Sequence, residues 1–216
     1  MPVIHSLVDV PAEKKRDDGH SPSFAVRIYM PRKTGSTQRK SPHIGNYTGS
    51  HVDYNGVGTW SAEAIQKRYR KYADVAGIDP LQLVPTRHTE GGRTWVYPLM
   101  AQIINLIEAG DKAAIEIGIE FIQEDDFFVF GRILKSITAR ALRRASLTQE
   151  QKTRIRERLV GMMLSGQVPH EWREYKRLLR HIGLGSLWPV LEEGVDRENE
   201  YVMRYYNYLD RFARSP

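Results

Sequence analysis

From residue 61 onward, apolar residues recur every three or four positions, the periodicity of amphipathic α-helices. This pattern predicts helices over residues 62–76, 99–109, 112–123, 126–145, 149–165 and 170–182, and a last segment from 186 that bends near Gly194 and runs to about 212. The loops between these helices are short, and short loops are typical of antiparallel neighbours. The pattern therefore favours a mainly α fold with a two-layer stack of helical hairpins.

Cap residues stand where the periodic stretches begin and end. Ser61 and Asp111 precede two of the stretches, and Thr148 with Gln151 has the spacing of a capping box. Gly77 directly follows the first stretch, and glycine is the residue that most readily ends a helix in a left-handed conformation. These residues fix the expected helix ends independently of the apolar pattern.

Each expected helix carries one apolar stripe, which is the face we expect to be buried. The stripes that bear on function are Phe127, Phe130, Ile133, Leu134, Ile137 and Ala141 in 126–145; Trp172, Tyr175, Leu178, Leu179 and Ile182 in 170–182; and Tyr201, Tyr205, Tyr208 and Phe212 in the last segment. One-sided stripes on consecutive helices predict two packed layers.

The first 60 residues have a different pattern. Two short apolar runs, Val3–Val10 and Phe24–Met30, are typical of strands ended by proline. The chain over 32–59 is rich in Gly, Ser, Thr, Asn and His, which predicts an extended arm or long loop. We therefore divide the chain into a small irregular or β N-terminal region, 1–60, and a helical domain, 61–216.

Within that domain, residues 81–97 predict a hairpin from 81–84 to 93–97, turning at Gly91 and Gly92.

Three segments of the helical region carry a family resemblance: Glu116–Phe121, Leu147–Lys152 and Arg173–Arg180. Together they span about residues 112–182, and this stretch resembles the helical hairpins of HEAT-type bacterial proteins of unassigned function. The resemblance is one of pattern, without a diagnostic motif. It implies a scaffold that binds through a surface rather than a catalytic centre.

Composition excludes several classes. The 216 residues contain no cysteine, so there is no disulfide framework, thiolate zinc site or thiol nucleophile. The N-terminus lacks the pattern of a signal peptide, and no apolar run approaches the roughly 20 residues that span a bilayer. We expect a cytoplasmic protein without a membrane contact, a cofactor or a recognisable catalytic residue set.

The chain has 32 basic and 26 acidic side chains, and the excess is concentrated in one region. Residues 146–183 hold eight basic and four acidic residues, whereas 184–216 has a net negative charge. Within 170–182, four cations fall within about a 100° arc of one helix: Arg173, Lys176, Arg177 and Arg180. Glu174 is expected to point away from this row, and Arg154 and Arg158 of the preceding helix are expected to add to it. The row is either an anion-binding surface or an ordinary solvated face.

Two other basic stretches are weaker candidates for anion contacts. The N-terminal arm carries Arg32, Lys33, Arg39 and Lys40, which could lie on a polyanion but lack phosphate-loop spacing. In 66–72, basic residues alternate with Tyr69 and Tyr72, a pattern that can stack bases. Both tyrosines, however, lie on the apolar face of their helix, which favours the core instead.

A metal site can be sketched from His43, His51 and Asp53. His51 and Asp53 lie two residues apart, so in a strand they would share a face, and imidazole and carboxylate are both metal ligands. No further local cluster completes the set, so a metal-dependent enzyme is the most remote of three hypotheses.

The leading hypothesis is a non-enzymatic helical protein that holds nucleic acid, or another polyanion, on the basic helix face. The alternative is an interaction scaffold or a subunit of an oligomer or larger assembly, binding an acidic protein surface. Its motivation is the acidic group near the C-terminus, which could dock on the basic row: Glu192, Glu193, Asp196, Glu198 and Glu200.

Overall fold

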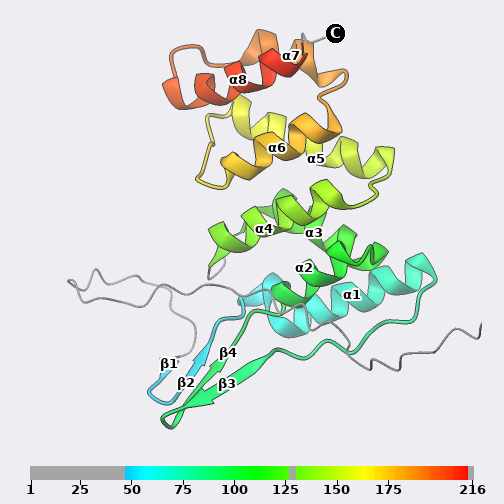
Figure 1. Cartoon of the computed structure of the whole chain (residues 1–216), viewed down its shortest axis with the longest axis vertical. Coiled ribbons are helices and arrows are strands. Elements are labelled where there is room, and N and C mark those ends of the chain that lie inside the picture. The colour runs from blue at the N-terminus through cyan, green and yellow to red at the C-terminus, as the bar shows by residue number, and fades with distance from the viewer. Residues whose placement is uncertain (1–46, 127–129, 214–216) are drawn as a thin grey trace, which may run out of the picture.

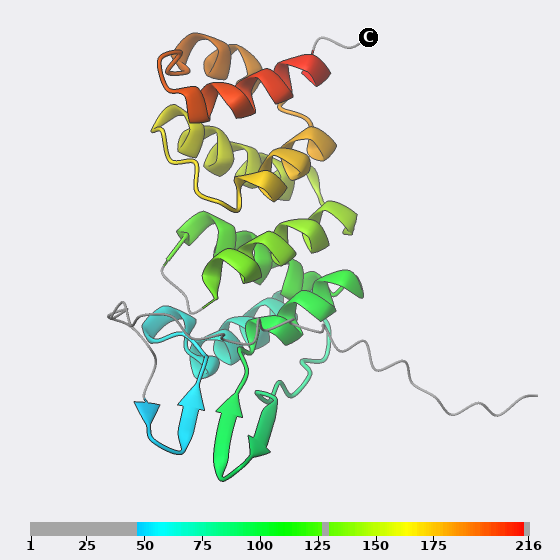
Figure 2. The same cartoon turned by 60° about the vertical axis from the view of Figure 1, so that its left-hand side comes forward.

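The computed structural model describes residues 47–126 and 130–213. In this part of the chain a small sheet lies at one end of an elongated stack of helices, and the last two helices lie at the other end (Figures 1 and 2). The mainly helical fold class with a small β region is thereby confirmed. None of the described helices combines the length and apolar character needed to cross a bilayer.

The sheet is assembled from two separate parts of the chain. Its strands are β1 (Tyr47–Thr48), β2 (His51–Asp53), β3 (Arg87–Glu90) and β4 (Arg93–Val96), in the order β1-β2-β4-β3. β2 runs parallel to β4, and β3 and β4 form an antiparallel hairpin. Residues 47–53, which the sequence places in an extended arm or long loop, therefore form a hairpin of two strands, and the pairing of β2 with β4 crosses the expected division at residue 60.

The expected hairpin exists, but its first strand lies further along the chain. Glu90 pairs with Arg93 across a two-residue turn in which Gly91 and Gly92 have φ of 54° and 74°. Such a turn needs positive φ at both positions, so glycine determines its place. The first strand begins at Arg87 rather than Leu81, which places Pro85 outside the ladder, where its missing N–H leaves no gap.

The helices follow the predicted order with small shifts at their ends. Their bounds are α1 (Ala62–Ala76), α2 (Met100–Glu108), α3 (Lys112–Glu124), α4 (Gly131–Arg144), α5 (Gln149–Leu164), α6 (Trp172–Ile182), α7 (Leu187–Gly194) and α8 (Glu200–Ala213). The expected caps are confirmed: Ser61, Asp111 and Thr148 accept hydrogen bonds from N–H groups of the first turn of α1, α3 and α5. Gly77 ends α1 with φ of 64°.

The helices form two columns. α1, α3, α5 and α7 pack in succession as one column, which we call the odd column. α2, α4, α6 and α8 pack in succession as the even column, which faces the viewer in Figure 1. The columns meet where α3 packs on α2 and α4, and where α5 packs on α6. Apolar side chains from both columns form one continuous buried core.

Two helix boundaries differ from the sequence prediction. The helix expected from 126 begins at Gly131 instead, because Asp125 and Phe130 adopt left-handed conformations with φ of 51° and 59°. Asp125 follows the end of α3, and its carboxylate binds Lys135 rather than capping α4. Within the predicted stripe of α4, Ile133 is exposed, whereas Leu134 and Ala141 are buried.

The last segment is two helices, and the buried face of the second was predicted wrongly. α8 buries Val202, Tyr206 and Leu209 against the stack. Two of the predicted core aromatics, Tyr201 and Phe212, are 74% and 45% exposed. The others in that stripe, Tyr205 and Tyr208, are half-buried. The buried face of α8 is therefore a second apolar series at helical spacing, Val202, Tyr206 and Leu209, and the aromatic series lies along the edge of the helix.

Candidate nucleic-acid interface

α6 presents its four cations on the side away from the core. Trp172, Tyr175, Leu178, Leu179 and Ile182 form its buried stripe, as predicted. The positions between them leave Arg173, Lys176, Arg177 and Arg180 exposed or half-buried. The C-terminal end of the helix is held by α5, because the guanidinium of Arg156 donates to the carbonyls of residues 182 and 183, both at 2.6 Å.

Within the described residues, Arg177 is the one member of this row that forms an ion pair with a carboxylate. Its Nη1 donates to Oε1 of Glu174 at 2.8 Å, and the other carboxylate oxygen of Glu174 lies 4.0 Å from Arg143 of α4. The side chain of Glu174 is only 11% exposed. The prediction that Glu174 points away from the row was therefore wrong, and it neutralises part of the charge of Arg177.

Lys176 and Arg180 lie against aromatic rings of α8 instead of carboxylates. The Nζ of Lys176 is 4.3 Å from the ring centroid of Tyr208 and 5.4 Å from that of Tyr205. The guanidinium of Arg180 is 4.7 Å from the centroid of Phe212. Ring faces attract a cation without cancelling its charge. The aromatic edge of α8 thus positions two cations of α6 and leaves them positive.

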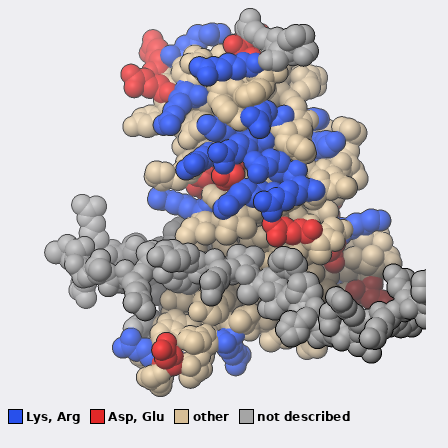
Figure 3. Space-filling model, viewed as in Figure 1, with Lys and Arg blue, Asp and Glu red and all other residues tan. Residues whose placement is uncertain are grey.

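A fifth cation, which the sequence reasoning missed, comes from α8. Burial lowers the pKa of Lys176, and the charges of Arg204, Arg177 and Arg173 lower it further. Arg204 lies one turn of α8 before Tyr208, the ring against which Lys176 lies, and Arg173 and Arg204 are both exposed. We call the set Arg173, Lys176, Arg177, Arg180 and Arg204 the cationic face. In Figure 3, Lys and Arg gather on this side of the molecule at the level of α4 and α6.

Arg154 and Arg158 do not belong to the cationic face, contrary to the prediction. Arg154 donates to Glu116 of α3 at 2.6 Å and to the side-chain oxygen of Gln123. Arg158 lies 3.6 Å from the carboxylate of Asp125. Both side chains turn inward because α5 lies between α3 and α6, so the positions counted as solvent-facing are contact positions.

The odd column contains a ladder of charges that binds its helices together. Along α3, Glu116, Glu120 and Glu124 are spaced four residues apart, which places them on one face. Arg68 of α1 donates to Glu120 at 2.8 Å and to Glu124 at 2.6 Å. The hydrogen bond with Glu124 is the main reason that the pKa of Arg68 is raised. Arg154 binds the third carboxylate, so the ladder joins α1 and α5 to α3.

The tyrosines of the α1 basic stretch belong to this packing rather than to a base-stacking surface. Tyr69 is buried and donates to Asp111 at 2.8 Å, and the hydroxyl of Tyr72 donates to Glu120. Burial is the main cause that raises the pKa of each tyrosine to about 12. The interpretation as a core residue is confirmed for Tyr69, and Tyr72 is half-buried and packs against the core.

The proposed metal ligands have other contacts where they are described. His51 and Asp53 flank the buried Val52 in β2, and Oδ1 of Asp53 accepts from the backbone and side-chain nitrogens of Asn55 at 2.8 and 2.9 Å. The described residues contain no group of three His, Asp or Glu side chains that could hold a metal ion. Several predicted features lie outside the described residues: His43, the arm cations Arg32, Lys33, Arg39 and Lys40, the runs Val3–Val10 and Phe24–Met30, and Phe127.

The acidic group of the C-terminal region lies at the α7–α8 end of the stack. Within the described residues, Glu193, Asp196, Glu198 and Glu200 form no ion pair with the cationic face. Asp196 instead accepts a hydrogen bond from the N–H of Glu198 in the loop before α8, at 3.0 Å. The cationic face is therefore not covered by these acids.

Comparisons with known proteins give no further information on this surface. The chain matches no protein family, no curated protein and no solved structure.

Proposed function

We propose that this protein binds nucleic acid, without catalysis, through the cationic face. One observation carries the proposal: Arg173, Lys176, Arg180 and Arg204 form no ion pair with any described carboxylate. Positive groups that lack internal partners attract anions from solution. In the odd column, in contrast, Arg68 and Arg154 are paired with carboxylates of α3.

The spacing of the cations suits a phosphate backbone. Arg173 and Arg180 are seven residues apart in α6, a rise of about 10 Å along the helix axis. Arg204 widens the face onto α8. Each cation that contacts a phosphate releases condensed counterions, so affinity depends steeply on salt and little on base sequence.

The test is a binding titration with a labelled oligonucleotide at several salt concentrations. We expect binding at about 50 mM salt, weakening in a linear log–log relation as salt rises. In Arg173→Glu/Arg180→Glu, affinity should fall at least about tenfold, and the salt slope should decrease by about 1.4 to 1.8. The matched control is Lys67→Glu/Arg70→Glu on α1, which changes the net charge equally at exposed positions outside the face. No binding by the wild-type protein at low salt ends the proposal.

A second candidate function is a subunit of a larger assembly. The observation that favours it is that, within the described residues, Glu193, Asp196, Glu198 and Glu200 form no ion pair with the cationic face, which leaves both groups available to an oppositely charged surface. Light scattering at low and high salt tests it. Self-association that high salt dissolves, and that Glu198→Lys/Glu200→Lys weakens, would support an assembly; a monomer at every concentration would count against self-assembly.

We also propose that the two columns are HEAT-type hairpin repeats. The successive packing of α1 on α3, α3 on α5 and α5 on α7, matched by the even column, supports this assignment. Stability in such an array depends on neighbouring units. Removing α7 and α8 should therefore leave a folded shorter array, which circular dichroism would detect; complete unfolding would contradict the repeat assignment.

A further inference from the structure

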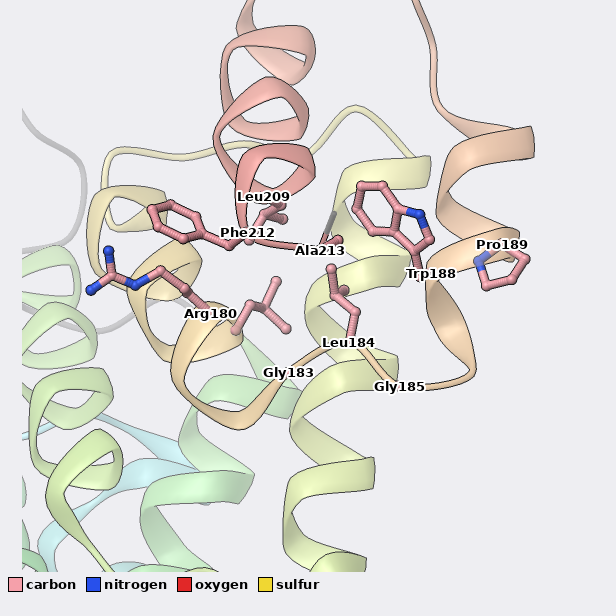
Figure 4. Close-up of a pocket in the computed structure, with 10 residues that line it drawn as sticks. Arg180, Gly183, Leu184, Gly185, Trp188, Pro189, Leu209, Phe212 and Ala213 are labelled. Carbon is pink, nitrogen blue, oxygen red and sulfur yellow. The ribbon is translucent and has the colours of Figure 1, made fainter. Parts of the chain in front are cut away.

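A cavity of about 500 Å³ opens beside the cationic face at the end of the stack, between the C-terminal end of α6, α7 and α8. Leu184, Leu209 and Phe212 supply apolar walls, and Trp188 supplies a second aromatic wall. Figure 4 shows Phe212 and Arg180 together on one side of this space and Trp188 on the opposite side. Its volume is in the range of sites for small organic groups.

Arg180 belongs to both surfaces. It is the last cation of the α6 row and also lines the cavity, with its guanidinium 4.7 Å from the ring centroid of Phe212. Arg180 is the charged side chain of this lining, so a ligand must combine a flat apolar part with a nearby negative charge. A nucleotide has that combination: an aromatic base joined to a phosphate.

We propose that the cavity receives an unpaired nucleobase of a single-stranded nucleic acid whose backbone lies on the cationic face. This inference rests on the proposed function and adds the substrate class. Single strands can turn bases outward onto aromatic rings and guanidinium planes, whereas paired bases in a duplex are not free to do so. The base occupies the space between Phe212 and Trp188, and Arg180 binds the adjoining phosphate.

An apolar protein segment fits the same cavity less well. It would cover the Arg180 guanidinium with nothing to replace water, and burying an unpaired charge is costly. Burial and the neighbouring charges of Arg204, Arg177 and Arg173 lower the pKa of Lys176, and phosphates relieve the repulsion between these charges, whereas an uncharged partner does not. Charge complementarity therefore selects a nucleic acid strand as the occupant.

Trp188 provides an independent signal for occupancy. Its ring is stacked on Tyr206, with centroids 5.5 Å apart and 15° between the planes. A base placed in the cavity should change its fluorescence. Trp60 and Trp172, in contrast, are buried in the core, and Trp95 is half-buried in β4 at the opposite end of the stack. The signal should therefore vanish in Trp188→Phe, while binding measured by anisotropy persists.

The deciding experiment compares three labelled probes of about 12 nucleotides at one salt concentration: a single strand, an abasic strand of equal charge, and a duplex. The base-bearing strand should bind about tenfold more tightly than the abasic strand and should alone change the Trp188 signal. Phe212→Ala should reduce this preference to about twofold or less, whereas Phe212→Tyr should retain it. Phe212 is half-exposed near the end of α8, so these variants should fold normally.

The possible failures are distinguishable. Equal binding of base-bearing and abasic strands would overturn the nucleobase cavity and leave the phosphate-binding face in place. A preference for bases that Phe212→Ala does not reduce would place base contacts elsewhere and also overturn the cavity. Tighter binding of the duplex than of the single strand would reject the substrate class. Absence of binding by any probe would remove the proposed function together with this inference.

Discussion

Two pairs of cations, one pair in each column, are held in opposite ways. In the odd column, Arg68 and Arg154 meet the carboxylates that α3 presents at four-residue spacing. In the even column, Lys176 and Arg180 meet aromatic rings that α8 presents along one edge. The basic helices themselves look alike in sequence. For these four cations, the helix packed beside them in the column decides whether they are paired with a carboxylate or remain available to a partner.

A cation paired with a carboxylate and a cation lying on a ring differ in how much positive charge remains available to a partner. A carboxylate at hydrogen-bonding distance cancels the positive charge and stabilises the contact between two helices. A ring beneath a cation contributes about 0.5 to 1 kcal/mol at an exposed site and leaves the net charge unchanged. The contacts of Lys176 and Arg180 therefore leave a positioned positive surface, whereas those of Arg68 and Arg154 hold α1 and α5 to α3.

The largest expected effect comes from giving the even column the chemistry of the odd column. Tyr205→Glu/Tyr208→Glu places carboxylates beside Lys176 and Arg180, so polyanion affinity should fall about a hundredfold at low salt. The fold should remain intact, since both side chains are half-buried at the edge of α8. Filter binding and a urea melt measure the two quantities.

A matched control for this exchange adds two carboxylates at exposed positions away from the cations. Val75 of α1 and Val190 of α7 are 80% and 49% exposed, so Val75→Glu/Val190→Glu gives the same formal charge. Affinity should then fall only about threefold, through general repulsion. Equal losses in the two double variants would mean that the cationic face is not the binding surface.

The next effect tests cohesion of the odd column. Arg68→Met removes the cation that pairs with Glu120 and Glu124 and lies 4.4 Å from the ring centroid of Trp60. We expect the free energy of unfolding to fall by about 2 kcal/mol, since hydrogen bonds between charged groups contribute about 1.5 to 3 kcal/mol. Arg70→Met, at an exposed site on the same helix, should change it by less than about 0.5 kcal/mol. Similar urea midpoints for the two variants would contradict the structural role of the ladder.

Local chemistry explains which parts of the fold are predictable from the sequence. The start of α1 at Ser61 and of α5 at Thr148 are decided by side chains that bind the first-turn N–H groups, and those residues are visible in the sequence. The start of α4 is not, because Asp125 is held by Lys135, a tertiary contact. The pairing of β2 with β4 joins segments some 40 residues apart and has no local signature.

The candidate site was predictable to the extent that it lies on one helix. The α6 row follows from periodicity alone, and its four positions do face outward as predicted. Its partners do not follow, because α8 offers two apolar series, and choosing between them needs the packed neighbour. Val202 and Leu209, seven residues apart, were the available signal. Because the aromatic series was predicted to be the buried face, its contacts with Lys176 and Arg180 were not foreseen.

The smallest effect, and the most specific to the even column, is the pH dependence of binding through Lys176. Its pKa is lowered from 10.5 by burial and by Arg204, Arg177 and Arg173, with Glu174 opposing. Lys176 therefore loses its proton at a lower pH than a free lysine does, and affinity for a polyanion should fall about twofold as the pH rises from about 8 toward 10.5.

The stability of the unbound protein should change in the opposite direction. In this window the unfolded chain holds a proton that the folded chain has released, so the free energy of unfolding rises with pH. Lys176→Arg, which stays charged, should abolish this component of both trends, as measured by anisotropy and urea melts at each pH. Unchanged pH profiles in that variant would show that Lys176 does not touch the bound anion.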